Sequence, residues 1–384
     1  MIAEASGKCA FPSSSQGSID NYRSLFTCFP TIGYQPAAHF QMDSILNSSL
    51  DGLAVNSPNF YLFALAGCIL VGVFLLTKGG DILTDGASDL ARSLGVHPAI
   101  IGLTVVSIAT SAPELFTSLA AIAGDAKDLI IGNVIGSNLA NVGLVLGIAT
   151  FINPIAMKGC LPNWQTNLLL LTTILFSAAC LWIGKESFDR QLGIIFTIIL
   201  VAYLIFVTRG AIIDRKAAKK SSEATAGPKE DETLVPPLKS LLIVVVASGA
   251  LWLGSDILVI GAKGLAEFAS IPQEIIGLTI VAIGTSLPEL AASCVLAKRG
   301  ESGMLLGNIV GSNLFNLTFV AGIAGTVSPI PVNPSLGQVE FPVMLLLTGI
   351  LCWLMRKKEI RILHGTFLLL IYFATICTAW FLHG

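Results

Sequence analysis

The chain has 384 residues, of which 54% are hydrophobic and only 12% are charged, and its formal net charge is −2. Roughly a quarter of the residues in a soluble domain are charged, so this composition excludes an ordinary soluble protein. The mean hydropathy of +0.80 and the apolar runs of about 20 residues predict an all-α polytopic membrane protein. We expect the lipid bilayer, and no nucleic acid, among its partners.

Residues 1–58 form a polar N-terminal extension. They are rich in Ser, Pro and Asn and lack a basic segment followed by an apolar one, so they do not resemble a secretory signal. Two interpretations stay open: a disordered extracellular extension, or a true start at an internal methionine, with Met42 as the obvious candidate.

Ten apolar stretches follow, each long enough to cross a bilayer as a helix. Five precede a polar segment, at 59–77 (running on toward 90), 99–123, 128–151, 163–184 and 190–208. Five follow it, at 238–266, 273–297, 303–326, 339–355 and 362–382. Because each half holds an odd number of spans, the halves enter the membrane in opposite orientations. The sequence thus predicts ten transmembrane helices in an inverted 5+5 repeat, with repeats at 59–209 and 238–384 and a linker at 210–237.

The distribution of lysine and arginine predicts the orientation. The loops after spans 1, 3, 5, 7 and 9 carry fifteen of these residues, whereas the loops after spans 2, 4, 6 and 8 carry three. Positive residues accumulate on the cytoplasmic side. We therefore expect a multi-pass protein of the cytoplasmic (inner) membrane with a cytoplasmic linker, a flexible tether by its composition, and with both termini outside.

The cysteines and histidines give no sign of a cofactor. The eight cysteines are dispersed, mostly inside spans, without paired metal-ligand spacing, which is typical of small core hydrophobes. The four histidines are scattered as well. We expect no cofactor and no enzymatic activity, because nucleophile–base pairs and cofactor motifs are also missing from the sequence.

One polar motif occurs twice at an offset of 175 residues. Residues 102–114 read GLTVVSIATSAPE and residues 277–289 read GLTIVAIGTSLPE, with nine of thirteen positions identical. Each copy places a glutamate and hydroxyl groups inside an apolar span, where ionisable residues are costly and usually functional. Helix-breaking polar motifs at matching positions of two halves indicate a secondary transporter.

The prolines of this motif free backbone oxygens at membrane depth. Pro113 and Pro288 clash with the carbonyl groups of Ala109 and Gly284, four residues earlier. Beside these carbonyls lie hydroxyl and carboxylate oxygens from Thr110, Ser111, Glu114, Thr285, Ser286 and Glu289. Such hard oxygen ligands suit sodium and calcium. The alternative is structural, because Ser-x-x-Glu is also a capping box at a helix start.

A second duplicated motif follows each glutamate. It reads GNVIGSNLANVG from Gly132 and GNIVGSNLFNLT from Gly307. Ser137 and Asn141 are four residues apart, as are Ser312 and Asn316, so each pair shares one helix face. These side chains complete a cation cage or, alternatively, form interhelical hydrogen bonds, while the glycines allow close helix packing.

Electrostatics predict how such a site operates. Two empty glutamates in the membrane would lose hydration and repel each other, and one divalent or several monovalent cations would neutralise them. If the empty, doubly charged site cannot reorient, the protein must carry a cation in each direction. Lys78, Asp81 and Asp85 near the end of the first span have partial repeat partners in Asp256 and Lys263. We expect the aligned Asp81 and Asp256 to cap helices or form pairs at the membrane interface, or alternatively to shape the potential of a vestibule.

These motifs resemble the two alpha-repeats of the calcium/cation antiporter superfamily, in its bacterial and archaeal sodium/calcium exchanger-like branch. The resemblance covers about 59–382 and implies exchange of calcium for sodium by alternating access in a monomer. It implies ligand roles for Glu114, Glu289, Thr110, Ser111, Thr285, Ser286, Ser137, Asn141, Ser312 and Asn316, with backbone carbonyls from Ser107 and Ala282. The position of Asn316 is aspartate in potassium-dependent relatives, so its amide argues against potassium co-transport.

Three other readings compete with sodium/calcium exchange. A proton-coupled divalent antiporter would use the same fold and site, because the glutamates are protonatable. A cation channel would use similar oxygens but needs a continuous pore. A membrane-embedded enzyme would use paired carboxylates for acid–base work, which the symmetry of the motifs suits less well.

Overall fold

The computed structural model describes residues 58–123, 129–157, 161–183, 187–223, 235–269, 282–333 and 338–383, with the single residues 127 and 336. Eight helices in this part of the chain are long and apolar enough to cross a membrane, and Glu340–Leu354 is a shorter apolar helix. The predicted polytopic helical architecture is therefore confirmed. The predicted N-terminal extension and the start of the seventh span lie outside the described residues.

Before α9, the described residues of the first half contain ten helical segments and two short strands. They are α2 (Pro58–Leu94), α3 (Pro98–Ile101), η3 (Gly102–Val106), α4 (Ser107–Thr110), α5 (Ala112–Ala123), α6 (Leu129–Ala140), η4 (Asn141–Val145), α7 (Leu146–Ile152), β1 (Ile155–Ala156), α8 (Asn163–Ala178), η5 (Ala179–Ile183) and β2 (Ser187–Phe188). The helix α9 (Arg190–Glu223) then leads into the linker. Segments labelled η are π-helical turns.

The second half repeats this order. It contains α10 (Pro237–Phe268), α12 (Ala282–Gly284), α13 (Leu287–Lys298), α14 (Ser302–Phe315), η7 (Asn316–Val320), α15 (Ala321–Val327), β3 (Ile330–Pro331), α16 (Glu340–Leu354), β4 (Glu359–Ile360) and α17 (Ile362–His383). The π-helix η7 starts 175 residues after η4, at the offset of the sequence motifs.

The helix α9 is longer than its predicted span. It continues from the expected end at 208 to Glu223, so the linker residues from 210 to 223 are helical. The added residues include alanine, lysine and arginine, which are strong helix formers. Residues 224–234, where the linker becomes acidic, lie outside the described residues.

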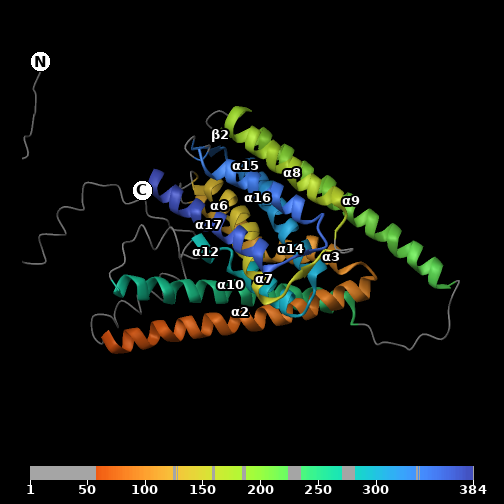
Figure 1. Ribbon diagram of the computed structural model, residues 1–384, viewed down its shortest axis with the longest axis horizontal. Helices are drawn as coiled ribbons and strands as arrows, with labels where there is room; N and C mark the ends of the chain where they lie inside the picture. Colours follow the sequence, from red (N-terminus) through yellow and green to blue (C-terminus); the bar gives the residue numbers. More distant parts are fainter. Residues whose placement is uncertain are drawn as a thin grey trace, which may run out of the picture. The chain divides into compact units, whose positions relative to one another are not determined.

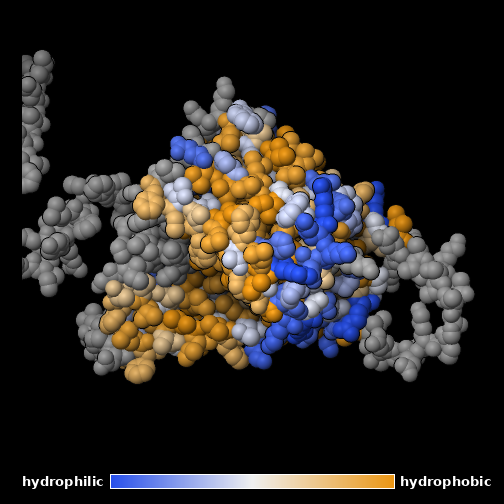
Figure 2. All heavy atoms as spheres, viewed as in Figure 1, coloured by the Kyte–Doolittle hydropathy of each residue, from blue (hydrophilic) through white to orange (hydrophobic). Residues whose placement is uncertain are grey.

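The outer surface is apolar, as a lipid-facing surface must be. Phe63 is 76% exposed, Leu70 71% and Val246 70%, exposures that a protein in water avoids for large apolar groups. Figure 2 shows hydrophobic residues over much of one face and hydrophilic residues gathered toward the side where α2 ends. The exposed apolar surface therefore belongs to the bilayer.

The helices α2 and α10 pack closely side by side along one side of the bundle (Figure 1). A Cβ at Gly72 would lie 2.8 Å from the Gly254 carbonyl oxygen, and one at Gly261 would lie 2.8 Å from that of Leu65. In α2, Gly72, Gly79 and Gly86 are spaced by seven residues and share one face. The contacts run from 65 with 261 to 72 with 254, so the two helices are antiparallel.

The centre of the bundle carries the second duplicated motif. In its most apolar window, Ser302–Val327 is 94% buried and Leu129–Ile152 is 78% buried, against 17% for α2. These two segments hold both asparagine-containing motifs. The polar residues therefore lie in the protein core and not against lipid.

Two short antiparallel strand pairs join the two halves, which the all-α prediction did not include. In one pair Ile155 lies opposite Ile360, and in the other Phe188 lies opposite Ile330. Such pairs satisfy the backbone groups of loops that leave the membrane. They have no sequence signature, because two residues are too few to show a strand period.

We predict opposite effects of adding one methyl group at two glycines of α2. Gly72→Ala should lower the free energy of unfolding by about 1–3 kcal/mol, because its Cβ would overlap α10. Gly67→Ala, where no described atom lies within 4 Å, should raise it by about 0.5–1 kcal/mol through helix propensity. Thermal unfolding of the two purified variants measures the difference, and equal midpoints would contradict the packing.

Candidate cation site

The two motif helices break at matching residues. Ser111 has φ −90° and ψ 4°, and Ser286 has φ −92° and ψ 4°. Both values lie in the sparsely populated bridge region, which is common at functional sites. Pro113 and Pro288 follow at the starts of α5 and α13 and cannot continue the preceding helix. The predicted breaks are thus present in both repeats.

The hydroxyl groups at the breaks do not act as the capping-box alternative requires. Ser286 makes no side-chain capping bond to α13, so that alternative is wrong at Ser286. The Ser111 hydroxyl instead donates to Oε1 of Glu289 over 3.1 Å. This bond joins the motif of one repeat to the glutamate of the other.

The two glutamates are buried and close to each other. Glu114 and Glu289 are each 1% exposed, and the hydroxyl of Ser111, three residues before Glu114, lies 3.1 Å from Oε1 of Glu289. Each has its Oε2 atom without a hydrogen-bond partner among the described residues. Since buried polar atoms are normally hydrogen-bonded, these oxygens are free to accept a cation.

Further unpartnered oxygens come from both repeats. Buried side-chain atoms without a hydrogen bond to any described residue include Oγ of Ser137, Ser286 and Ser312 and both amide atoms of Asn141 and Asn316. The alternative of interhelical hydrogen bonding is therefore not met for Ser137, Asn141, Ser312 and Asn316 within the described structure.

Two π-helical turns present the asparagines. Asn141 is the first residue of η4 and Asn316 the first of η7, and such turns often occur at functional sites. The turn η4 contacts α13, which carries Glu289, and η7 contacts α5, which carries Glu114. Each glutamate helix therefore packs against the asparagine turn of the other repeat.

The remaining candidate residues are Thr110, Thr285, Ser107 and Ala282, and they differ in hydrogen bonding and burial. The Thr110 hydroxyl donates to Oδ1 of Asn308 over 3.3 Å, whereas Thr285 is half-buried. The Ser107 hydroxyl donates to the Leu103 carbonyl over 2.8 Å, and its own carbonyl accepts from the Ser111 backbone N–H at 3.0 Å. Ala282 begins the short helix α12.

Sequence reasoning missed two polar partners of the site. Asn308 accepts from Thr110 and donates to Ser293 over 3.5 Å. The Ser255 hydroxyl of α10 donates over 2.6 Å to the Gly284 carbonyl, the oxygen that Pro288 frees. Asn308 stood within the duplicated motif, but nothing in the sequence linked Ser255 to a residue 29 positions away.

The glycines of the second motif allow close packing in one repeat. A Cβ at Gly307 would lie 2.4 Å from the Ala99 carbonyl oxygen, and one at Gly311 2.5 Å from that of Leu103. Gly132 and Gly136 have no described atom within 4 Å of such a Cβ. The packing interpretation is therefore confirmed for the second repeat.

The oxygen set suits a hard cation. No group of three or more His, Cys, Asp and Glu side chains in the described residues could hold a metal ion. The candidate ligands are instead two carboxylates supplemented by neutral hydroxyl and amide oxygens. This set of ligands is typical of sites for sodium and calcium.

The chain matches one known protein family over most of its length. The family described as sodium/calcium exchanger protein matches residues 64–209 and 239–381. The chain belongs to the sodium/calcium exchanger family. It is therefore a multi-pass membrane protein related to cation antiporters.

Individual members of the sodium/calcium exchanger family align with this chain over most of its length. It is 33% identical to the inner membrane protein YrbG of Escherichia coli, over 74% of this chain and 87% of the relative. It is 30% identical to the sodium/calcium exchanger MaX1 of Methanosarcina acetivorans, over 82% and 98%. The solved structure of the sodium-calcium exchanger NCX_Mj matches with a TM-score of 0.69 and 29% identity, over 82% and 98%.

We predict that Asn316→Asp alters ion selectivity more than stability. Both amide atoms of Asn316 are unpartnered among the described residues, so a carboxylate there adds charge to the site without removing a described bond. Competition of sodium, potassium and protons with calcium uptake measures the change. Asn138→Asp is the contrast, because the Asn138 amide donates to the Val134 carbonyl over 2.7 Å and its loss should lower stability. Unchanged competition in Asn316→Asp would contradict a ligand role.

Proposed function

We propose that this protein exchanges calcium for sodium across the cytoplasmic membrane by alternating access. The observation that carries the proposal is the buried pair Glu114 and Glu289, each with an unpartnered oxygen among the described residues. One glutamate comes from each repeat, and the Ser111 hydroxyl of the first repeat bonds the glutamate of the second. A site built equally from two halves suits a carrier whose halves move against each other.

The proposed ligands are numerous enough for calcium. Calcium takes about six to eight oxygen ligands. The set comprises Glu114, Glu289, Thr110, Ser111, Thr285, Ser286, Ser137, Asn141, Ser312 and Asn316, with carbonyl oxygens of Ser107 and Ala282. The unpartnered atoms of seven of these side chains support the assignment. Calcium and sodium are the transported substrates, and we propose no resident cofactor.

Exchange follows from the cost of the empty site. Two ionised carboxylates in a low-dielectric core repel each other and have lost their hydration, at a cost of several kcal/mol for each charge. One calcium ion or two or more sodium ions neutralise them. The site therefore reorients when loaded and not when empty, which couples the two fluxes.

The proposal includes ten membrane crossings in an inverted 5+5 repeat. The pairing of β2 with β3 supports it, because paired strands lie on one side of the membrane. Between them lie α9, α10, the segment containing α13, and α14 with its continuation to α15. Two strands on the same side of the membrane are separated by an even number of crossings. With the α13 segment the number is four, and without it the number would be three. The pairing of β1 with β4 then requires α16 to cross as well.

The orientation rests on charge. The loop of β4 carries Arg356, Lys357, Lys358 and Arg361, which favours the cytoplasmic side for β1 and β4. The linker then lies in the cytoplasm and both termini outside. The antiparallel packing of α2 on α10, the first helices of the two repeats, supports the inverted arrangement. We further propose that one chain suffices for transport, since each chain supplies both glutamates.

We predict calcium uptake into proteoliposomes that are loaded with sodium and contain the purified protein. Uptake should require internal sodium and fall at least tenfold in Glu114→Gln and in Glu289→Gln, because each variant removes half of the site's charge. Glu301→Gln is the matched control, since Glu301 precedes α14 outside the site and should leave uptake unchanged.

Two other outcomes would revise the proposal. Uptake driven by a proton gradient and indifferent to sodium would make the protein a proton-coupled divalent antiporter with the same fold. Normal calcium uptake in either glutamate variant would contradict the assignment of Glu114 and Glu289 to the cation site.

We predict that two loops are reached from opposite sides of the membrane. In a background without other accessible cysteines, Lys358→Cys should react with an impermeant maleimide only from the cytoplasmic side, and Ser328→Cys only from outside. Labelling of both positions from one side would refute the ten-span topology.

A further inference from the structure

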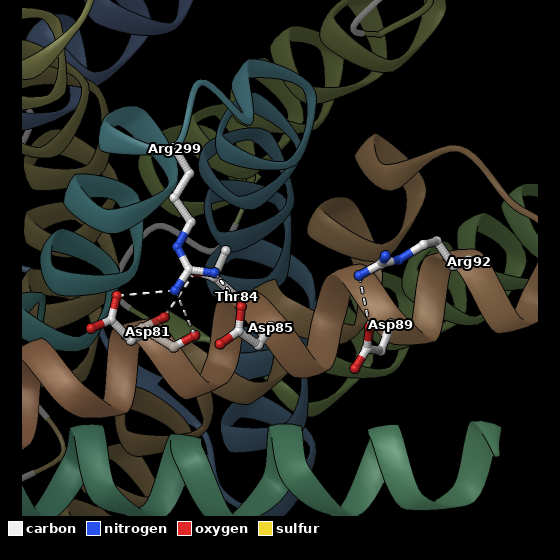
Figure 3. A network of polar contacts seen from close by, with 7 residues as sticks. Asp81, Thr84, Asp85, Asp89, Arg92 and Arg299 are labelled. Carbon is white, nitrogen blue, oxygen red and sulfur yellow. Dashed lines mark hydrogen bonds and ion pairs between the residues drawn. The ribbon is translucent and has the colours of Figure 1, made fainter. Parts of the chain in front are cut away.

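An ion-pair network joins α2 to the end of α13 (Figure 3). Arg299 follows the last residue of α13 and donates from Nη1 to Asp85 of α2. Its Nη2 donates to Oδ1 of Asp81 over 3.1 Å and to the Asp81 carbonyl over 3.4 Å. Hydrogen bonding to Asp85 raises the pKa of Arg299 above its ordinary value, so the guanidinium remains charged. The Arg299 side chain thus binds residues from two successive turns of α2.

This network lies at the edge of a cavity. The cavity has a volume of about 420 Å³ and lies between α2, α7 and α13. Asp81 and Lys298 line it together with Thr77 and Cys294. Next to it the two helices touch, because a Cβ at Gly80 would lie 3.2 Å from the Ala291 carbonyl oxygen.

The helix α13 links the network to the cation site. It has 12 residues, a length of about 18 Å, with Glu289 in its first turn and Arg299 directly after its end. On the proposed topology this end faces the cytoplasm. A movement of α2 away from α13 would therefore open a path from the cytoplasm toward Glu289, and Arg299 opposes that movement.

The three residues of this network are not all repeated in the sequence of the other half. At the offset of 175 residues, Asp81 corresponds to Asp256, but Asp85 corresponds to Ile260 and Arg299 to Gly124. The sequence therefore supplies this set of one arginine and two aspartates on the side of Arg299 and does not repeat it at the matching positions. An inverted repeat with equal halves would favour neither side, whereas this pairing stabilises closure on the side of Arg299.

We propose that Arg299, with Asp81 and Asp85, latches the cytoplasmic side of the transport path closed and so sets how often the carrier opens to the cytoplasm. This inference rests on the proposed alternating access, but not on which cation is coupled. Arg299 acts as a positioning residue, because it touches α2 and not the cation ligands. The side chain of Arg299 is 33% exposed, so its pairs contribute modestly and the latch can open during each cycle.

Cys294 provides a built-in reporter for the test. It is half-buried and lines the cavity beside the latch. In the full chain with the other cysteines replaced, the rate of Cys294 modification by a small water-soluble maleimide measures opening of this side. We predict that Arg299→Gln raises this rate about fivefold, as expected for loss of a partly exposed ion-pair network.

Two comparisons separate the latch from other effects of charge. Arg92→Gln removes an ion pair with Asp89 of 2.8 Å that lies within α2 alone, and it should leave the rate unchanged. Asp81→Asn with Asp85→Asn should raise the rate as Arg299→Gln does, and adding Arg299→Gln to that pair should have no further effect.

The expected result is therefore a faster reaction in both latch variants, without additivity. Equal rates in Arg299→Gln and the parent protein, or fully additive effects, would overturn the proposal. Because the readout is the accessibility of Cys294, it holds even if the coupled ion proves to be the proton. Failure of calcium exchange with an intact labelling difference would remove calcium as the proposed substrate and leave alternating access and the latch.

Discussion

Two carboxyl groups buried inside a membrane protein impose the constraint on which the rest of this structure depends. A charge at the bilayer centre costs from about 2.5 to more than 10 kcal/mol, and Glu114 and Glu289 are each 1% exposed. A cation relieves both the desolvation and the mutual repulsion. In the proposed function, the unpartnered hydroxyl and amide oxygens of both repeats would serve the same end, because they can replace the hydration of an ion without adding charge.

The same constraint gives a reason for the duplication. Each repeat supplies one of the two glutamates, one broken helix and one π-helical turn that begins with an asparagine, and each glutamate helix packs against that turn of the other repeat. Half of the molecule would hold half of a site. The strand pairs β1–β4 and β2–β3 likewise join one repeat to the other.

The sequence alone predicted features that are local or repeated. The breaks at Ser111 and Ser286 follow from prolines two residues later, and the burial of Asn141 and Asn316 follows from polar residues within apolar segments. Features that depend on distant residues were not predictable in this way. The bonds from Ser255 to Gly284 and from Arg299 to Asp85 join α10 and α2 to the second motif helix, and no local pattern encodes such pairs. The extension of α9 to Glu223 was not predicted, because its charged residues were interpreted as a linker. The same lysine and arginine residues favour a helix.

The central claim is that the empty site does not cross the membrane, so every calcium ion that leaves must be replaced by a cation. The direct measurement is efflux of radioactive calcium trapped in proteoliposomes, in the absence of sodium and of a pH gradient. The account predicts rapid efflux when unlabelled calcium is present outside and almost none when the outside contains only choline. Equal efflux under both conditions would contradict obligatory exchange and make the protein a channel or uniporter.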